Sequence, residues 1–399
     1  MEDRLKSTRL TVFLIVLLDV MGLGLIIPAQ PFLAKSLGAS TTTVTQLGTI
    51  YSLMQFVLSP VWGSLSDRFG RRPILFFTLS ITALGHLAFA FSSSLVLLFL
   101  ARALVGIGAA NIATAQAVIS DTHPANERSR AMALIGAAFG LGFVLGPALG
   151  GILFALDVRA PALLAAALAT LNIVLVFFAV RETSSQRTHA VSLLALFRAD
   201  GALRQLIVTT LFMMTAFALM EQSVALFIES IWVPERGDIG MKQATKLTSI
   251  FLVVVGVTAI FVQGFLVRKW LKVVREERLL KLGLVVIASS LALIPLLGAL
   301  GSYPLFLLSG SLLALGSGLF NPSMLGLVSL SSPPDRQGVA LAINQSASAL
   351  GRILGPLCAG ALFSCWGPLP FTVGVALTLV ALALSWRVAP PPRASTPQG

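Results

Sequence analysis

Twelve apolar runs, most of them about 20 residues long, constrain this 399-residue chain more than any other feature. About 20 apolar residues suffice for a helix to cross a bilayer, and only helices and closed barrels satisfy their backbone hydrogen bonds there. With 56% hydrophobic and 11% charged residues, the composition excludes an ordinary soluble domain. The sequence therefore predicts an all-α membrane protein with twelve transmembrane helices at residues 10–33, 44–65, 73–92, 95–118, 131–154, 160–180, 205–230, 247–267, 280–300, 303–328, 338–364 and 369–388.

A segment rich in glycine occurs once in each half of the chain. Gly142–Gly151 reads GFVLGPALGG, and Gly351–Gly360 reads GRILGPLCAG. A repeat at about half the chain length is typical of transporters built from two related membrane halves. We therefore expect two pseudo-symmetric six-helix halves around a central cavity, with a first half at 1–180, a cytoplasmic linker at 181–204, a second half at 205–388 and a disordered tail at 389–399.

In the first copy, glycines recur at every fourth residue and so lie on one face of the expected fifth helix. Small residues on one face let another helix backbone approach closely, and a proline beside them bends the helix. Two interpretations remain open: a close-packed helix pair, or a hinge or seal at which this face packs against a helix of the other half. The residues to which we assign a gating role are Gly142, Gly146, Pro147, Gly150, Gly355 and Pro356.

The net charge of +12 is a topology signal and does not indicate binding to nucleic acid. Most of the 28 lysines and arginines fall near the chain ends, in the central linker and in loops that follow even-numbered helices. The opposite loops hold only Lys35, Arg159, Arg236, Lys242 and Lys246. Cytoplasmic loops carry such a basic excess. We expect a monomer in the lipid bilayer of a cell inner membrane, with both termini in the cytoplasm.

Four ionisable residues lie within the apolar runs, on the first, fourth, seventh and eleventh helices: Asp19, Arg102, Glu221 and Arg352. A charge at bilayer depth costs about 3 kcal/mol or more, so each should face a partner or a water-filled cavity. One interpretation is two fixed ion pairs, one per half, that join Asp19 to Arg102 and Glu221 to Arg352. The other is that at least one acid exchanges protons during transport. Asp19 is our first candidate for this proton coupling, and Glu221 is its rival.

The loop after the second run reads GSLSDRFGRRP, and its gating candidates are Gly63, Asp67, Arg68, Gly70 and Arg71. Glycines permit a tight turn, and a proline is accepted in the first turn of the following helix. This loop resembles the signature loop of the major facilitator superfamily almost position by position. Its second copy is degenerate, with Arg268 where the acid would stand. The resemblance implies that Asp67 faces the positive N-terminal end of the eleventh helix.

Three more segments resemble the same family. Arg102–Gly108 (RALVGIG) resembles its fourth-helix motif, and Gly142–Gly151 resembles a fifth-helix motif associated with antiporters. Leu18–Pro28 (LDVMGLGLIIP) resembles the first helix of tetracycline-efflux proteins and related proton-coupled drug antiporters. The resemblance implies a secondary active transporter that exports amphiphilic organic compounds or drugs, driven by protons and working by alternating access.

In such a fold, a central cavity between the halves would hold the substrate. Uncharged polar residues within the apolar runs, together with aromatic residues, are candidates for its wall. Their default role is the interhelical hydrogen bond or simple packing. The candidates are Gln55, Asn111, Gln116, Phe139, Phe217, Asn344 and Gln345.

No segment resembles a GK[ST] nucleotide loop, a catalytic triad or a metal site, and the two cysteines form no ligand pattern. We therefore expect no enzymatic activity and no cofactor, with a small-molecule substrate and protons as partners. Two alternatives remain. One is a transporter of organic anions or lipid-like metabolites, in which Arg102 and Arg352 neutralise the substrate. The other is a non-transporting membrane receptor or scaffold.

Overall fold

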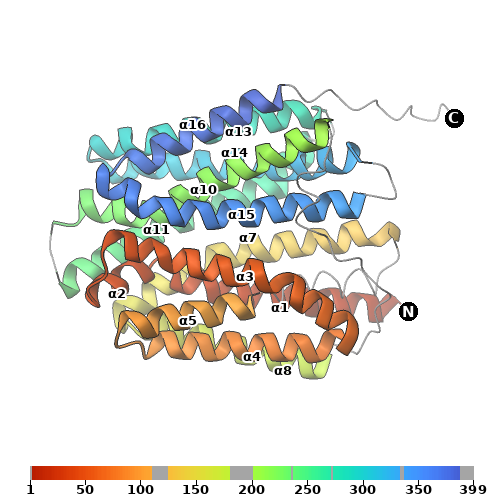
Figure 1. The fold of residues 1–399 in the computed structure, drawn as a ribbon, viewed down its shortest axis with the longest axis horizontal. Helices are drawn as coiled ribbons and strands as arrows, with labels where there is room; N and C mark the ends of the chain where they lie inside the picture. Colours follow the sequence, from red (N-terminus) through yellow and green to blue (C-terminus); the bar gives the residue numbers. More distant parts are fainter. Residues whose placement is uncertain are drawn as a thin grey trace.

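The computed structural model describes residues 2–109, 125–179, 201–234, 237–270, 273–332 and 337–386, which form a bundle of roughly aligned helices (Figure 1). Seven of these helices are long and apolar enough to cross a membrane, and the bent pair Leu10–Ile26 with Gln30–Ser36 makes an eighth. Three shorter apolar helices and α3 complete the described crossings. The predicted twelve-helix architecture is confirmed.

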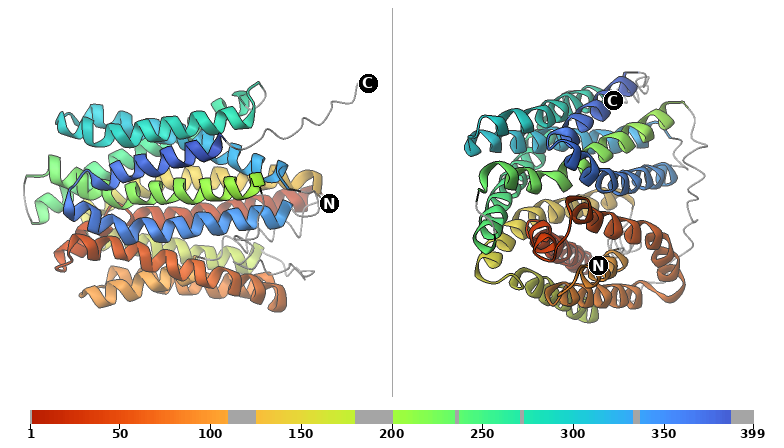
Figure 2. Two further views of the ribbon diagram at one scale, coloured as in Figure 1. Left: turned by 45° about the horizontal axis from the view of Figure 1, so that its top comes forward. Right: turned by 60° about the vertical axis from the view of Figure 1, so that its left-hand side comes forward.

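The helices form two halves that lie side by side (Figures 1 and 2), and each half has six membrane crossings if α1 and α2 count as one. The N-terminal half contains α1 (Glu2–Ile26), α2 (Gln30–Ser36), α3 (Thr41–Phe69), α4 (Arg71–Ala90), α5 (Leu95–Gly108), α7 (Ala125–Leu156) and α8 (Ala160–Ala179). The C-terminal half contains α10 (Gly201–Trp232), α11 (Asp238–Phe261), α13 (Glu276–Ala299), α14 (Tyr303–Leu330), α15 (Gln337–Cys365) and α16 (Leu369–Ser385). A π-helical turn (Val262–Leu266) and the short α12 (Val267–Trp270) extend α11.

Helix α1 begins, and helix α16 ends, at the same end of the bundle, on the right in Figure 1. We call this the terminal end and the opposite one the distal end. Helix α2, the end of α10 and the start of α11 lie at the distal end (Figure 1).

The first crossing is broken, which corrects the expectation of one helix over residues 10–33. Helix α1 ends at Ile26, and α2 begins at Gln30 with a bend of 40° between the two. Pro28 and Pro31 lie in and just after the break, and a proline has no backbone N–H with which to continue the helical hydrogen bonds. The first helix of the second half, α10, has no such break and runs on to Trp232.

The glycine face of α7 packs within its own half, so the expectation of a contact with the other half is wrong for this face. A Cβ at Gly146 would lie 2.8 Å from the Cα of Gly24, and one at Gly150 would collide with the carbonyl oxygen of Leu25. Gly142 faces Val20 in the same way, at 2.7 Å. All three neighbours belong to α1. The glycines therefore bring α1 and α7 into backbone contact.

The second copy repeats this arrangement. A Cβ at Gly351 would lie 2.8 Å from the Cβ of Met214, and one at Gly355 would lie 2.9 Å from the backbone nitrogen of Leu219. Both neighbours belong to α10, the counterpart of α1. The sequence repeat therefore corresponds to two equivalent helix pairs, α1 with α7 and α10 with α15.

The last glycine of each copy lies between the two halves. A Cβ at Gly151 would lie 2.6 Å from the Cβ of Ser249 on α11, and one at Gly360 would lie 2.5 Å from the Cα of Thr42 on α3. Helices α7 and α15 end at the distal end, where α11 and α3 begin. We call these contacts the α7–α11 seam and the α3–α15 seam. They join the halves at the distal end.

Candidate transport site

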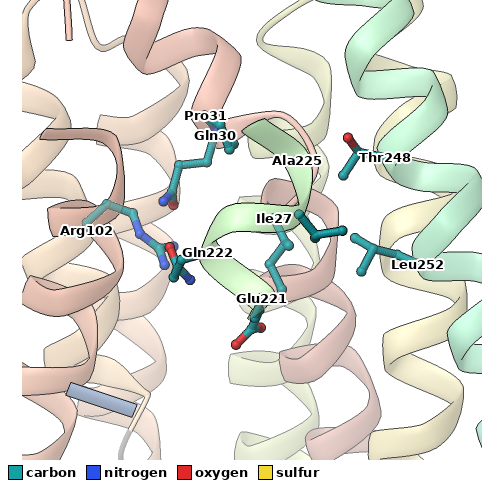
Figure 3. A pocket seen from close by; sticks show the side chains of 10 residues that line it. Ile27, Gln30, Pro31, Arg102, Glu221, Gln222, Ala225, Thr248 and Leu252 are labelled. Carbon is teal, nitrogen blue, oxygen red and sulfur yellow. The ribbon is translucent and has the colours of Figure 1, made fainter. Parts of the chain in front are cut away.

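A cavity of about 40 Å³ lies where the halves meet, and polar side chains from both halves line it. Gln30 and Arg102 reach it from α2 and α5, whereas α10 and α11 contribute Glu221, Gln222 and Thr248 (Figure 3). The remaining wall consists of Ile27, Pro31, Val224, Ala225 and Leu252. One water molecule needs roughly 10–15 Å³ of such space, so the cavity has room for about three.

Arg102 is buried, with 4% of its surface exposed. Its guanidinium carbon lies 4.7 Å from the centre of the Tyr51 ring on α3. A desolvated cation–π contact of this kind contributes about 2 kcal/mol. Neither Nε nor Nη1 of Arg102 has a hydrogen-bond partner among the described residues. Since unpaired buried donors are costly, these two groups favour water or a ligand group that accepts hydrogen bonds.

Glu221 interacts electrostatically with arginines from both halves. The charges of Arg352 on α15 and Arg102 on α5 both act on its carboxylate. Among the described residues, however, no ion pair joins Glu221 to either arginine. The expected fixed pair between Glu221 and Arg352 is therefore wrong. In Figure 3, the Arg102 guanidinium lies beside Gln222, and the carboxylate of Glu221 points away from Gln30.

Asp19 lies on α1, is half-buried and does not line this cavity. Its charge acts on Tyr51, as do the charges of Arg102 and Arg352. The charge of Glu221 also acts on Tyr51, so all four intramembrane charges influence this tyrosine of α3. The role of Asp19 in proton coupling stays a prediction.

The described polar candidates for a substrate cavity have other contacts. Gln55 donates a hydrogen bond to the carbonyl oxygen of Ala109 at 3.3 Å. Asn344 accepts one from the hydroxyl of Thr210 at 2.7 Å, which ties α15 to α10. Gln345 is exposed. None of the three lines the 40 Å³ cavity.

Of the aromatic candidates and the remaining amides, only Phe217 has a described side chain. Phe217 packs against the core of the C-terminal half. Asn111 and Gln116 lie outside the described residues, and the side chain of Phe139 is likewise not described. The part that these residues play in substrate binding stays a prediction.

Sequence reasoning missed three polar residues of the cavity wall: Gln30, Gln222 and Thr248. Gln222 lies so close to α3 that a Cβ at Gly48 would be 2.7 Å from its Oε1. Thr248 has a buried hydroxyl without a partner among the described residues. A signal was present for Gln222, because it directly follows an intramembrane acid in the sequence.

The predicted gating loop forms a tight turn between α3 and α4 at Gly70, whose φ of 98° favours glycine. Arg71 is buried and donates a hydrogen bond to the Ser66 hydroxyl at 2.5 Å. Arg68 is exposed over the Phe69 ring, and a Cβ at Gly63 would meet nothing within 4 Å. The Asp67 side chain lies outside the described part, so its contact with the eleventh helix stays a prediction.

Comparison with known proteins identifies the family of this fold. The Major Facilitator Superfamily model matches residues 12–300 and 247–399. The chain belongs to the Major Facilitator Superfamily. A multi-pass membrane transporter of this superfamily accounts for the paired halves and for the charged cavity between them.

Relatives within the superfamily are resistance proteins. The chain is 30% identical to the class B tetracycline resistance protein of Escherichia coli over 393 residues, with 95% of each chain covered. It is 32% identical to the class C protein of Escherichia coli, with 92% of this chain and 93% of the relative covered. Multidrug resistance protein 2 of Bacillus subtilis is 27% identical, with 94% of each covered.

Solved structures share the fold at lower identity. The human organic anion transporter MFSD10 has a TM-score of 0.72 at 23% identity and covers 96% of this chain and 99% of its own. An inward-facing, occupied bacterial homologue of the human lysosomal transporter Spinster has a TM-score of 0.73 at 15% identity, with 95% of each chain covered.

Proposed function

We propose that this superfamily member is a proton-driven antiporter that exports amphiphilic organic compounds, tetracycline-type drugs among them, by alternating access. One observation carries the proposal. An acid of the C-terminal half, Glu221, and an arginine of the N-terminal half, Arg102, line one cavity between the halves. The names of the relatives in Escherichia coli and Bacillus subtilis support the substrate class.

In this proposal, protonation of Glu221 changes the charge of the cavity and thereby the arrangement of the two halves relative to each other. An ionised Glu221 attracts Arg102 across the interface and favours the arrangement that keeps the two together. A proton bound to its carboxylate cancels this attraction, so an arrangement that separates them gains population. Release of that proton on the other side of the membrane restores the attraction. The cycle requires that the two arrangements hold Glu221 with different proton affinities.

Arg102 and Asp19 have complementary parts in the proposal. The unpaired Nε and Nη1 of Arg102 bind a hydrogen-bond acceptor of the substrate once water leaves the cavity. Asp19 is a second acid that exchanges protons, and its charge acts on Tyr51, as does the charge of Arg102.

We place the terminal end in the cytoplasm of a bacterial inner membrane, because basic loops mark the cytoplasmic side. Because the two seams close the distal end, we propose that the arrangement in Figure 1 is a state that faces the cytoplasm. We also propose a monomer as the working unit.

A second candidate function is export of an organic anion. It is favoured by Arg102, whose two unpaired donors suit an anionic group. A receptor or scaffold without transport activity is the least favoured function, because a rigid bundle gains nothing from buried charges.

Tetracycline uptake by everted membrane vesicles separates these functions. With an acidic lumen, the antiporter accumulates the drug, and a protonophore abolishes the accumulation. An anion facilitator equilibrates p-aminohippurate, an organic anion, with or without the proton gradient. Vesicles that contain the folded protein and behave as protein-free vesicles with both compounds would contradict the proposal.

A further inference from the structure

A break in the first crossing joins helix α2 to α1, whereas α10, the first helix of the other half, is unbroken. Residues Ile27–Ala29 separate it from α1, and the two helix axes differ by 40°. Pro28 removes one hydrogen-bond donor in this break, and Pro31 removes another in the first turn of α2. Such an interruption is a natural hinge, because a few residues at the end of an element can absorb a large change in backbone angles.

Two side chains of α2 hold it against the other half. Phe32 is 2% exposed and packs in one apolar cluster with Ala225 of α10 and Ala244 of α11. One turn later, the Nζ of Lys35 donates to a carboxylate oxygen of Glu229 on α10 at 2.5 Å. We call these contacts the α2 clasp. Phe32 with Ala225 and Lys35 with Glu229 give two successive points of contact between α2 and α10.

The clasp is partly exposed at the distal surface. The side chains of Lys35 and Glu229 keep 34% and 28% of their surface exposed. An ion pair at that level of exposure adds little stability, because both partners regain hydration when they separate. The clasp is therefore strong enough to bias the position of α2 and weak enough to open.

Helix α2 also forms part of the wall of the cavity that holds Arg102 and Glu221. Its residues Gln30 and Pro31, and Ile27 in the hinge, line that cavity (Figure 3). Displacement of α2 would open this wall toward the distal side. The seams between the halves rest instead on contacts of Gly151 with the Ser249 side chain and of Gly360 with the Thr42 backbone, which α2 does not form.

We propose that α2 is a lid over the distal side of the Arg102–Glu221 cavity, hinged at Ile27–Ala29 and held shut by Lys35 and Glu229. The lid opens while the α3–α15 seam stays closed, and it admits water and protons to the cavity from the distal side. This inference builds on the proposed function, but the motion of the lid does not depend on which substrate is carried or on how the protein is oriented.

Cysteine labelling of the purified full-length protein in lipid nanodiscs tests the lid. In a Cys358→Ser/Cys365→Ser background, Ala244→Cys places a thiol under α2, and Thr45→Cys places a matched thiol in the α3–α15 seam. Both parent side chains are fully buried. A water-soluble maleimide then reports how often each position is uncovered. Because both faces of a nanodisc are in water, neither membrane orientation nor transport activity affects the result.

Glu229→Gln and Lys35→Met should each raise the labelling rate of Ala244→Cys about two- to fivefold and leave that of Thr45→Cys unchanged. The double exchange Lys35→Glu/Glu229→Lys should restore slow labelling. Phe32→Ala provides a second route to the open lid and should also expose Ala244→Cys.

Three results would overturn the proposal. Unchanged labelling of Ala244→Cys in both single variants would show that the ion pair does not hold α2. An equal increase at both thiols would show that the halves separate as rigid bodies. If Ala244→Cys is labelled as fast in the Lys35→Glu/Glu229→Lys variant as in Glu229→Gln, the attraction between the two side chains is irrelevant. If the labelling pattern is as expected but the wild-type protein transports no drug, the proposed function is contradicted and the lid is not.

Discussion

At the scale of single residues, the four intramembrane charges were found from the sequence because a charge within an apolar run has few harmless explanations. Their partners could not be found in this way. Sequence position fixes the depth of a residue in the membrane but not the direction in which its helix faces. The pairing of Glu221 with Arg352 therefore failed as a fixed ion pair, and Gln222 was missed although it adjoins Glu221.

Tyr51 offers a test of how Arg102 is held. Tyr51→Phe keeps an aromatic face under the guanidinium group, whereas Tyr51→Leu removes it. Loss of a cation–π contact worth about 1–2 kcal/mol corresponds to a rate lower by a factor of roughly five to thirty. We expect initial tetracycline transport rates near wild type for Tyr51→Phe and lowered by about that factor for Tyr51→Leu. Equal rates for the two variants would assign Tyr51 a packing role only.

The two acids can be compared directly. Glu221→Gln and Asp19→Asn each remove a titratable group at nearly constant volume. We expect both variants to lose drug accumulation driven by a proton gradient, while exchange of labelled for unlabelled drug without a gradient survives. Accumulation and exchange in everted vesicles measure the two activities. Normal accumulation by Asp19→Asn, together with none by Glu221→Gln, would assign coupling to the C-terminal half and contradict the role of Asp19.

At the scale of helices, the sequence predicted the apolar spans and the glycine faces but not what those faces touch. A face of small residues permits close approach by any helix, so the pattern cannot distinguish α1 from a helix of the other half. The break at Ile27–Ala29 was also missed, since membrane helices often tolerate a proline without interruption.

The backbone contact between α1 and α7 predicts a loss of stability. A Cβ at Gly150 would collide with the Leu25 carbonyl, which cannot move without shifting α1. Overpacking of this kind costs about 1–3 kcal/mol. Thermal unfolding of the purified Gly150→Ala variant should therefore begin at a lower temperature than that of the wild type. Gly63→Ala is the matched control, because its Cβ meets nothing within 4 Å. An equal unfolding temperature for all three proteins would exclude the tight α1–α7 contact.

The α3–α15 seam predicts a different effect. A Cβ at Gly360 would press on the backbone of Thr42, in the other half. Gly360→Ala should therefore separate the halves at the distal end and speed maleimide labelling of Thr45→Cys. Gly367→Ala, which meets only Phe363 at 3.8 Å, should leave labelling unchanged. Slow labelling in both variants would mean that the seam can absorb the methyl group.

At the scale of the whole molecule, the two-half architecture followed from the sequence because a repeat of the glycine segment implies a repeat of the helix pair. Orientation rests on the basic loops alone. Cys365 is exposed at the distal end of α15. In a Cys358→Ser variant, a maleimide that cannot cross membranes should label Cys365 on intact cells. Labelling only after the cells are opened would place the distal end in the cytoplasm and reverse the proposed direction of transport.

The central claim is that drug and protons move in opposite directions through one protein. The most direct measurement follows the internal pH of proteoliposomes that are loaded with tetracycline and diluted into drug-free buffer. As the drug leaves, the account predicts that wild-type protein acidifies the lumen faster than in protein-free liposomes, and that a protein with Asp19→Asn and Glu221→Gln together does not. Drug release by the wild-type protein with no acidification beyond that of protein-free liposomes would contradict proton-coupled antiport.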